Sequence, residues 1–421
     1  MNFPLFKYDI FSNNEYYLFF YGIVFLDLPR YGFSILINAL FLRCVAPVNE
    51  NFMPKITVVV ASHNGAASII QSIQSILNQS RPIHEIIIVD DCSSDETTEI
   101  IQSAYKQKLI TIALFHNRRC GKSASVNHAA RFATGDFILN IDDDTVLNYD
   151  AIEKLGSVFL DGNTVIASGA LTIRNSEASL VTSLQTIEYQ LSMVGGRSFL
   201  DLFGAVPCCS GAFSIYRRKF FSDAGGLNTG PGEDLEITLR ARHFGYDVHF
   251  VESAQASILA PDTFLKLLGQ RLRWDCDELN IRMNQFNEFN VFKRMNRRSE
   301  YFHMLDFLVF TLIPTILFPA YLIYIYFKFS SDALIFLIAL YAYVTPFYLF
   351  LIGINIFSSK SKISIFDLLV TPIFPLYQGV LMKMFRLYAY ATEIIFRGST
   401  RDDYVPSRIR QALYAAPGSK K

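Results

Sequence analysis

Two long apolar segments in the C-terminal third constrain this chain more than any other feature. Phe307–Phe327 and Ala333–Ser359 contain no charged residue, and each is long enough for a membrane-crossing helix, which needs about 20 residues. The linker Lys328–Asp332 is so short that the two helices must form a hairpin. In the whole chain 51% of the residues are hydrophobic and only 18% are charged. The sequence therefore predicts an α-helical transmembrane region, which we place at residues 301–397.

Two further apolar stretches are interrupted by charges or prolines. Tyr16–Leu42 has Asp27 and Arg30 near its centre, so neither half alone can cross a bilayer. It predicts one kinked crossing within an N-terminal membrane segment, residues 1–50, in which Asp27 and Arg30 can pair at i, i+3. Leu368–Met382 is shorter and contains two prolines, which leaves a re-entrant segment, an interfacial segment and a third crossing open.

The distribution of charge predicts the orientation. Basic residues flank the hairpin on one side, namely Lys293, Arg294, Arg297, Arg298, Lys360 and Lys362. Cytoplasmic loops are rich in Lys and Arg, so we expect a multi-pass protein of the plasma (inner) membrane with its attached domain in the cytoplasm and Met1 outside. The formal net charge is zero, which gives no indication of a nucleic-acid partner. The six cysteines have no metal-ligand spacing, and reduced thiols are expected.

Residues 51–260 have the alternating pattern of an α/β domain. Ile56–Ala61 is a continuous β-branched run, as expected of a buried parallel strand, and Ala66–Gln79 has apolar residues at helical spacing. Further strand-like runs are Glu85–Val89, Thr111–Phe115 and Asp136–Ile141. This pattern predicts a doubly wound parallel sheet with helices on both faces and a ligand beyond the carboxyl ends of the strands. Residues 261–300 are then interfacial helices, and 398–421 a cytoplasmic or interfacial tail.

Acidic residues follow two of these strands. Asp91 can accept a hydrogen bond from the N–H of a base, or its turn can cap the next helix. Asp142 and Asp144 point to the same side of an extended segment, where two carboxylates repel each other unless a cation joins them. A hard ion, Mg²⁺ or Mn²⁺, that also binds phosphate oxygens would remove this repulsion. A solvated acidic turn is the alternative.

Two later motifs carry further polar groups. Glu233 and Asp234 follow a Gly-rich run, and Asp234 is either the N-cap of a helix or a base that deprotonates an acceptor hydroxyl. Gln270, Arg273 and Trp274 lie at i, i+3 and i+4, so they share one helix face. That face can hold a diphosphate and a sugar ring, or it belongs to an amphipathic helix on the membrane surface.

In this order and spacing the motifs resemble the family 2 glycosyltransferases, and among them the membrane-integrated processive synthases of cellulose, chitin oligosaccharide, poly-N-acetylglucosamine and hyaluronan. The matching pieces are VDDCSSDET (Val89–Thr97), CGKSASVNHAARFATGDFILNIDDDT (Cys120–Thr145), CSGAFSIYRR (Cys209–Arg218), GEDLEITLRA (Gly232–Ala241) and QRLRW (Gln270–Trp274). The resemblance implies a GT-A-like domain and metal-dependent, inverting transfer from a UDP-sugar. The implied acceptor is a growing polysaccharide, which the membrane helices would export.

The resemblance also implies roles for single residues. Asp91 would bind the uracil, Asp142 would lie against the nucleotide and phosphate, and Asp144, with Asp142, would bind the metal. Glu233 and Asp234 would be the catalytic acids, with Asp234 as the general base.

For the leaving group and the acceptor, Arg273 with Gln270 would clamp the diphosphate, and Trp274 would stack near the acceptor sugar. Lys122 would contact nucleotide or phosphate, or is simply exposed to solvent. Its Gly-Lys-Ser triplet is not a P-loop.

Several features depart from the family pattern or fit another class. Gly65 stands where the family often has an acid, and Asp275–Glu278 is unusually acidic. Arg397–Arg401 is faintly like the family's gating segment, or is a basic patch beside the membrane. A transferase that adds one sugar to a lipid carrier and a non-enzymatic scaffold remain alternatives. The sugar, a homo-oligomer and an export partner are left open.

Overall fold

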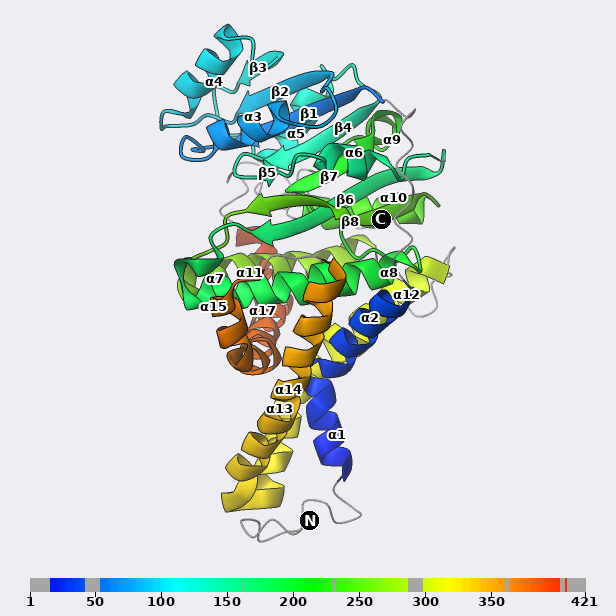
Figure 1. Ribbon diagram of the computed structural model, residues 1–421, viewed down its shortest axis with the longest axis vertical. Coiled ribbons are helices and arrows are strands. Elements are labelled where there is room, and N and C mark those ends of the chain that lie inside the picture. The colour runs from blue at the N-terminus through cyan, green and yellow to red at the C-terminus, as the bar shows by residue number, and fades with distance from the viewer. Residues whose placement is uncertain are drawn as a thin grey trace.

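The computed structural model describes residues 16–41, 54–160, 162–228, 230, 232–286, 298–359, 363–401 and 406. Its centre is one eight-stranded sheet (Figure 1). The strand order is β3 (Ile112–Phe115), β2 (Glu85–Asp90), β1 (Ile56–Ser62), β4 (Phe137–Asp142), β7 (Phe213–Arg217), β6 (Thr164–Ile173), β8 (Asp247–Ile258) and β5 (Val146–Leu147).

The predicted α/β fold class is confirmed, and the sheet is mixed rather than wholly parallel. β3, β2, β1 and β4 run parallel to one another, and their β-branched runs are buried because helices cover the sheet. β7 runs antiparallel between β4 and β6. The helices of this domain are α3 (Ile69–Leu77), α4 (Thr97–Lys106), α5 (Lys122–Ala130), α6 (Ala151–Gly156), α9 (Arg218–Asp223) and α10 (Glu233–His243).

A layer of helices lies between the sheet and the apolar end of the molecule (Figure 1). It contains α7 (Leu180–Tyr189), α8 (Ser198–Asp201) and α11 (Phe264–Asn280). Ser179 caps α7 with a reciprocal capping box, and Thr263 caps α11. The buried apolar side chains of this layer pack with those of the C-terminal helices in one cluster, for example Leu184 and Leu267 with Val344. Helix α11 is therefore held in place by packing against the C-terminal helices.

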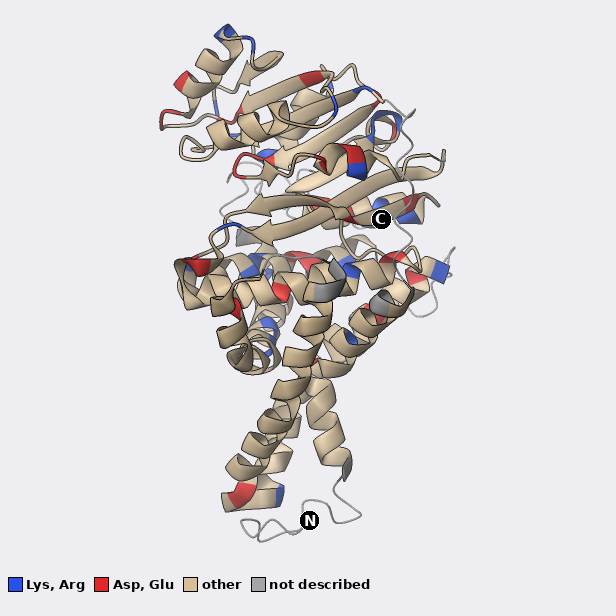
Figure 2. Ribbon diagram, viewed as in Figure 1, with Lys and Arg blue, Asp and Glu red and all other residues tan. Residues whose placement is uncertain are grey.

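The apolar end is helical, as predicted. It comprises α1 (Tyr16–Phe25), α2 (Leu28–Phe41), α12 (Arg298–Phe307), α13 (Ile313–Phe329), α14 (Ala333–Ser359), α15 (Ile365–Val370), α16 (Phe374–Leu376) and α17 (Lys383–Phe396). α13 and α14 form the expected hairpin, joined at Ser330–Asp332, and the rings of Phe329 and Phe336 stack 4.7 Å apart. Figure 2 places charged residues at the tip of this hairpin and around the sheet, with an uncharged zone between them.

Two helical stretches of the described residues are apolar and long enough to cross a membrane: Arg298–Ile356, which includes both arms of the hairpin, and Ile365–Phe396. α1 and α2 would add a third span if they are taken together across their bend of 68°. The bend lies at the predicted kink. Of the basic residues used for orientation, Lys293, Arg294, Arg297, Lys360 and Lys362 lie outside the described residues.

The predicted pairing of Asp27 with Arg30 is wrong. Asp27 pairs with Lys383 of α17 at 3.0 Å, and Arg30 pairs with Asp306 of α12, also at 3.0 Å. Both acids are largely buried among helices that are distant in sequence. Charges inside an apolar helical region pair across helices because each must find a partner away from water.

Candidate active site

The carboxyl end of β4 and the start of α5 meet through an ion pair. Asp142, the last residue of β4, pairs with Lys122, and each side chain is 33% exposed. The Lys122 ammonium also donates to the carbonyl of Gly211 at 3.1 Å. Burial alone would lower the pKa of Lys122, but the negative charges of Asp142 first, and then of Glu233, raise it above its ordinary value. Lys122 is therefore a cation that two partners hold at the edge of the sheet, with a third of its side chain exposed.

Gly211 connects this pair to α10. Its N–H donates to the Asp234 carboxylate at 3.1 Å, and its carbonyl accepts from Asn140 at 2.8 Å. A side chain at position 211 would start at an ordinary contact distance of 3.6 Å from Asp234 but only 3.2 Å from the Lys122 nitrogen, which would have to shift by a few tenths of an ångström. The N-cap of α10 is Gly232, in the left-handed region at φ 71°, so Asp234 is inside the first turn and not the cap.

Glu233 ties this cluster to the QRLRW helix. Burial raises the pKa of Glu233, the nearby Lys122 lowers it and Asp234 raises it again. Arg273 of α11 also acts on it electrostatically. The structure thus brings the start of α5, the end of β4, the start of α10 and the middle of α11 to one place.

The three consecutive aspartates Asp142–Asp144, which begin at the last residue of β4, differ in their surroundings. Asp143 accepts a hydrogen bond from Ser62 at 2.5 Å, whereas Asp142 faces Lys122. Burial and the charges of Asp142 and Asp143 raise the pKa of Asp144 to about 6, against weaker opposition from Lys122 and Arg174. Crowded carboxylates of this kind gain from a hard cation, so their oxygen donors fit Mg²⁺ or Mn²⁺.

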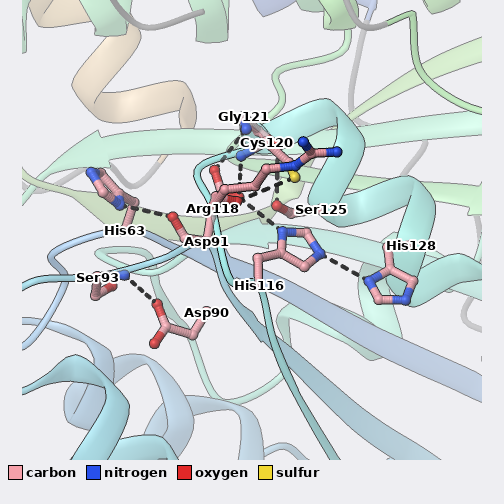
Figure 3. A network of polar contacts seen from close by, with 10 residues as sticks. All are labelled: His63, Asp90, Asp91, Ser93, His116, Arg118, Cys120, Gly121, Ser125 and His128. Carbon is pink, nitrogen blue, oxygen red and sulfur yellow. Dashed lines mark hydrogen bonds and ion pairs between the residues drawn. The ribbon is translucent and has the colours of Figure 1, made fainter. Parts of the chain in front are cut away.

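Asp91 is buried, and both of its carboxylate oxygens have protein partners (Figure 3). Its two carboxylate oxygens accept from the backbone N–H groups of Cys120 at 2.6 Å and Gly121 at 2.7 Å, and His116 Nδ1 lies 2.9 Å from the first. Neighbouring Asp90 holds its own turn, accepting from the N–H of Ser93 at 2.9 Å. Asp91 therefore fixes the loop before Lys122.

On α11, Trp274 is 37% exposed and carries the guanidinium of Arg271 over its ring, 4.8 Å from the centroid. Arg271 pairs with Glu188 of α7 at 2.8 Å, and Glu188 also accepts from Tyr377 at 3.0 Å. Gln270 is half-buried one turn before Trp274. Arg271 and Glu188 were not predicted, although a single acid in the apolar run of α7 is a signal for a buried, paired charge.

The unusual acids after Trp274 have structural partners. Asp275 pairs with Arg386 of α17 at 3.0 Å, and Glu278 pairs with Arg282 at 3.0 Å. After α17, Ser399 binds Glu393 through its N–H and its hydroxyl. Pro406 lies beside Gly121, with its Cδ 3.2 Å from the position of an added Cβ. The end of the described chain thus returns to the loop that Asp91 holds.

The comparisons with known proteins agree on the catalytic class. Residues 57–225 match the family model described as glycosyl transferase family 2. An N-acetylglucosaminyltransferase of Azorhizobium caulinodans is 32% identical over 235 residues, which are 52% of this chain and 59% of that relative. A poly-beta-1,6-N-acetyl-D-glucosamine synthase of Staphylococcus aureus is 30% identical over 231 residues, 54% of this chain and 55% of that relative. The matches thus span little more than half the length of these curated relatives.

A solved structure shares the fold. It is a mannosyltransferase from Pyrobaculum calidifontis in complex with GDP-Man and Mn²⁺, with a TM-score of 0.58 at 16% identity, and the alignment covers 90% of this chain and 99% of that one. At this identity the likeness concerns the fold alone.

Proposed function

Residues 57–225 form a glycosyl transferase family 2 domain, and from this premise we propose that the protein is a membrane-bound inverting transferase that polymerises N-acetylglucosamine from a UDP-linked donor. One observation carries the proposal: Lys122 and Asp234 meet at Gly211, Asp142 pairs with Lys122, and Glu233 interacts electrostatically with both Lys122 and Arg273. Such a group of opposite charges suits a diphosphate leaving group and an acceptor hydroxyl. The names of the two curated relatives support the choice of sugar.

Asp142 and Asp144 are the residues that would hold Mg²⁺ or Mn²⁺. The raised pKa of Asp144 supports this role, because crowded, partly buried carboxylates are stabilised when a divalent ion joins them. The bound ion would supply Lewis-acid stabilisation of the charge that develops on the departing diphosphate. Asp91 would contact the uracil only through lone pairs that its amide partners leave available.

Two cationic side chains, Lys122 and Arg273, would also stabilise the negative charge that develops on the departing diphosphate. Lys122 is held charged beside Asp142, and Arg273 reaches the cluster from α11 with Gln270 one turn earlier. Positive groups that are already held where negative charge accumulates lower the barrier to transfer. Lys122 would exchange its contact with Asp142 for the phosphate when the donor binds.

Asp234 is the proposed general base. The N–H groups of Gly211 and Leu235 hold its two oxygens at 3.1 and 2.8 Å, which orients the carboxylate toward one acceptor position. Glu233 beside it has a raised pKa because it is buried, so it is the second acid of the site. Trp274 would form the sugar platform, with one ring face already covered by Arg271.

Polymer export through the helical region is the finer part of the proposal. The apolar stretches Arg298–Ile356 and Ile365–Phe396 support a membrane location, and α11 lies against α17 through the Asp275–Arg386 pair. The growing chain would thus leave the platform of Trp274 directly into the helical region. The cytoplasmic location of the domain is inferred from the distribution of basic residues in the sequence.

The test is an assay of the purified full chain in detergent with UDP-N-acetylglucosamine and Mg²⁺ or Mn²⁺, following UDP release and product size. We expect polymer and UDP from the wild type. Asp234→Asn should reduce both by about 10²–10⁴-fold and still bind UDP. The matched control Asp223→Asn removes an exposed acid that pairs with exposed Lys219 and should keep full activity. A single-sugar lipid adduct would refute polymerisation, and near-full transfer by Asp234→Asn would refute the base.

A further inference from the structure

Three side chains of different chemistry that can bind a metal meet beyond the carboxyl ends of β2 and β3. Asp91 follows β2, His116 follows β3, and Cys120 precedes α5. Their ligand atoms all lie within 4.8 Å of one another, and Asp91 Oδ1 and His116 Nδ1 are 2.9 Å apart (Figure 3). His116 and Cys120 belong to the one loop between β3 and α5, and the fold brings Asp91, from the loop after β2, beside them.

We propose that Asp91, His116 and Cys120 bind a Zn²⁺-class ion. A carboxylate oxygen, an imidazole nitrogen and a thiolate sulfur form a donor set that Zn²⁺ and Cd²⁺ accept and that Mg²⁺ does not. The site is therefore distinct in its metal preference from the oxygen-only pair Asp142 and Asp144. Three protein ligands leave a fourth tetrahedral position for water or a ligand.

The scaffold of the site is already rigid. The N–H groups of Cys120 and Gly121 hold the Asp91 carboxylate at 2.6 and 2.7 Å, and that carboxylate is almost wholly buried. Donor atoms of one tetrahedral zinc site lie roughly 3.3–3.6 Å apart, from Zn–N near 2.0 Å and Zn–S near 2.3 Å. The Cys120 sulfur, within 4.8 Å of the other two, must therefore approach by roughly 1.2–1.5 Å at most. Cys120 is partly exposed, and a rotation of its side chain achieves this.

A fourth residue fits the outer sphere. His116 Nε2 lies 2.9 Å from His128 Nδ1, and the two rings stack at 5.1 Å (Figure 3). A histidine that binds a metal through one nitrogen usually donates from the other to a fixed acceptor. In the proposed site the ion takes Nδ1 of His116, whose proton then sits on Nε2 and is donated to His128. His128 keeps its own proton on Nε2, and the Cys120 thiol releases one proton to solvent, so one proton leaves for each ion bound.

Binding would have a consequence at the catalytic centre. The ion would join the end of β2 to the loop that ends at Lys122, the residue paired with Asp142. Fixing this loop restricts the exchange of Lys122 between Asp142 and a phosphate. Zn²⁺ is therefore expected to slow transfer; this effect rests on the proposed function, whereas ion binding itself does not.

The experiment titrates the full chain in detergent with CdCl₂ and records the ultraviolet charge-transfer absorption of a thiolate–cadmium bond. The wild type and the control Cys92→Ser should show the same absorption, since Cys92 is exposed and outside the ligand set. Cys120→Ser, which keeps the size of the side chain, should lose one cadmium per chain and its absorption. His116→Gln should weaken cadmium binding at least tenfold. Equal absorption in Cys120→Ser and wild type overturns the proposal.

A second arm measures UDP release at increasing ZnCl₂ with saturating Mg²⁺. Inhibition that is relieved in Cys120→Ser and unchanged in Cys92→Ser supports the link to Lys122. Inhibition of all three proteins at the same ZnCl₂ concentration would overturn that link. The absorption arm needs no activity, so failure of the metal site and failure of the proposed transferase function are distinguishable.

Discussion

The buried ion pair beneath Trp274 gives the most direct test of how the α11 face is held. Glu188 accepts from Arg271 at 2.8 Å and from Tyr377 at 3.0 Å on the same oxygen, and the paired side chains are only 13% and 9% exposed. The perturbation is Glu188→Gln, which keeps the size of the side chain and an acceptor for Tyr377 but removes the charge. Arg271 is then left buried without its counter-charge.

The magnitude follows from this geometry. Removing one partner of a buried ion pair costs about 3–5 kcal/mol, and the retained amide acceptor places Glu188→Gln near 3 kcal/mol. For a domain of roughly 200 residues, in which 1 kcal/mol shifts the thermal midpoint by 2–4 °C, this corresponds to a loss of about 6–12 °C. Arg271 stacks 4.8 Å from the Trp274 ring centroid, so its displacement also changes the surroundings of the indole.

Trp274 is the only tryptophan in the chain, which makes intrinsic fluorescence a reporter for this one face. We expect Glu188→Gln to lower the thermal midpoint, shift the emission and increase quenching by acrylamide. The matched control is Glu153→Gln, which removes a more exposed pair with Arg81, 25% and 24% exposed. It should cost less than about 1 kcal/mol and leave the emission unchanged. A Glu188→Gln protein with the midpoint and emission of Glu153→Gln would refute the reasoning.

Two further predictions concern the catalytic edge. Burial and the neighbouring carboxylates raise the pKa of Asp144 to about 6, so the folded state holds more protons than the unfolded state between roughly pH 4 and 6. Without divalent metal, Asp144→Asn should therefore have a higher thermal midpoint than the wild type at pH 7 and the same midpoint near pH 4. Equal midpoints at pH 7 would contradict this. Mn²⁺ affinity should correspondingly fall as the pH drops through about 6. Gly211→Ala places a carbon 3.2 Å from the Lys122 nitrogen, which must then shift by a few tenths of an ångström, and should reduce UDP release by less than about tenfold with little change in midpoint. Gly162→Ala, at a position with open space, should leave the rate unchanged.

The sequence predicted the strands and the strand-end acids well, for a physical reason. Buried parallel strands need continuous β-branched runs, and Ile56–Ala61 and Glu85–Val89 fall within one residue of β1 and β2. The acids that follow a strand are then placed at the sheet edge by chain connectivity alone. What the sequence did not contain is the partner of each acid, such as the amides that hold Asp91.

The insertion of β7 between β4 and β6 could not be derived either. Its pairing joins segments that are distant along the chain, and antiparallel and parallel neighbours leave the same buried pattern in a short strand. Yet this strand sets the site, because it follows Gly211, where Lys122 and Asp234 meet. A local departure from parallel order therefore sets a contact of the proposed site.

The acidic run after Trp274 was a departure from the family pattern that helical spacing can explain. Arg271, Asp275 and Glu278 lie at i, i+4 and i+7, so they share one face of α11, and their partners are Glu188, Arg386 and Arg282. Gln270, Arg273 and Trp274 occupy the adjacent face. The same helix thus devotes one face to ion pairs, two of them with surrounding helices and one with Arg282 directly after α11, and the next face to the proposed site. Breaking a buried ion pair is strongly destabilising, so the pairs on one face hold α11 in place. They thereby keep Arg273 and Trp274, on the adjacent face, in a fixed orientation.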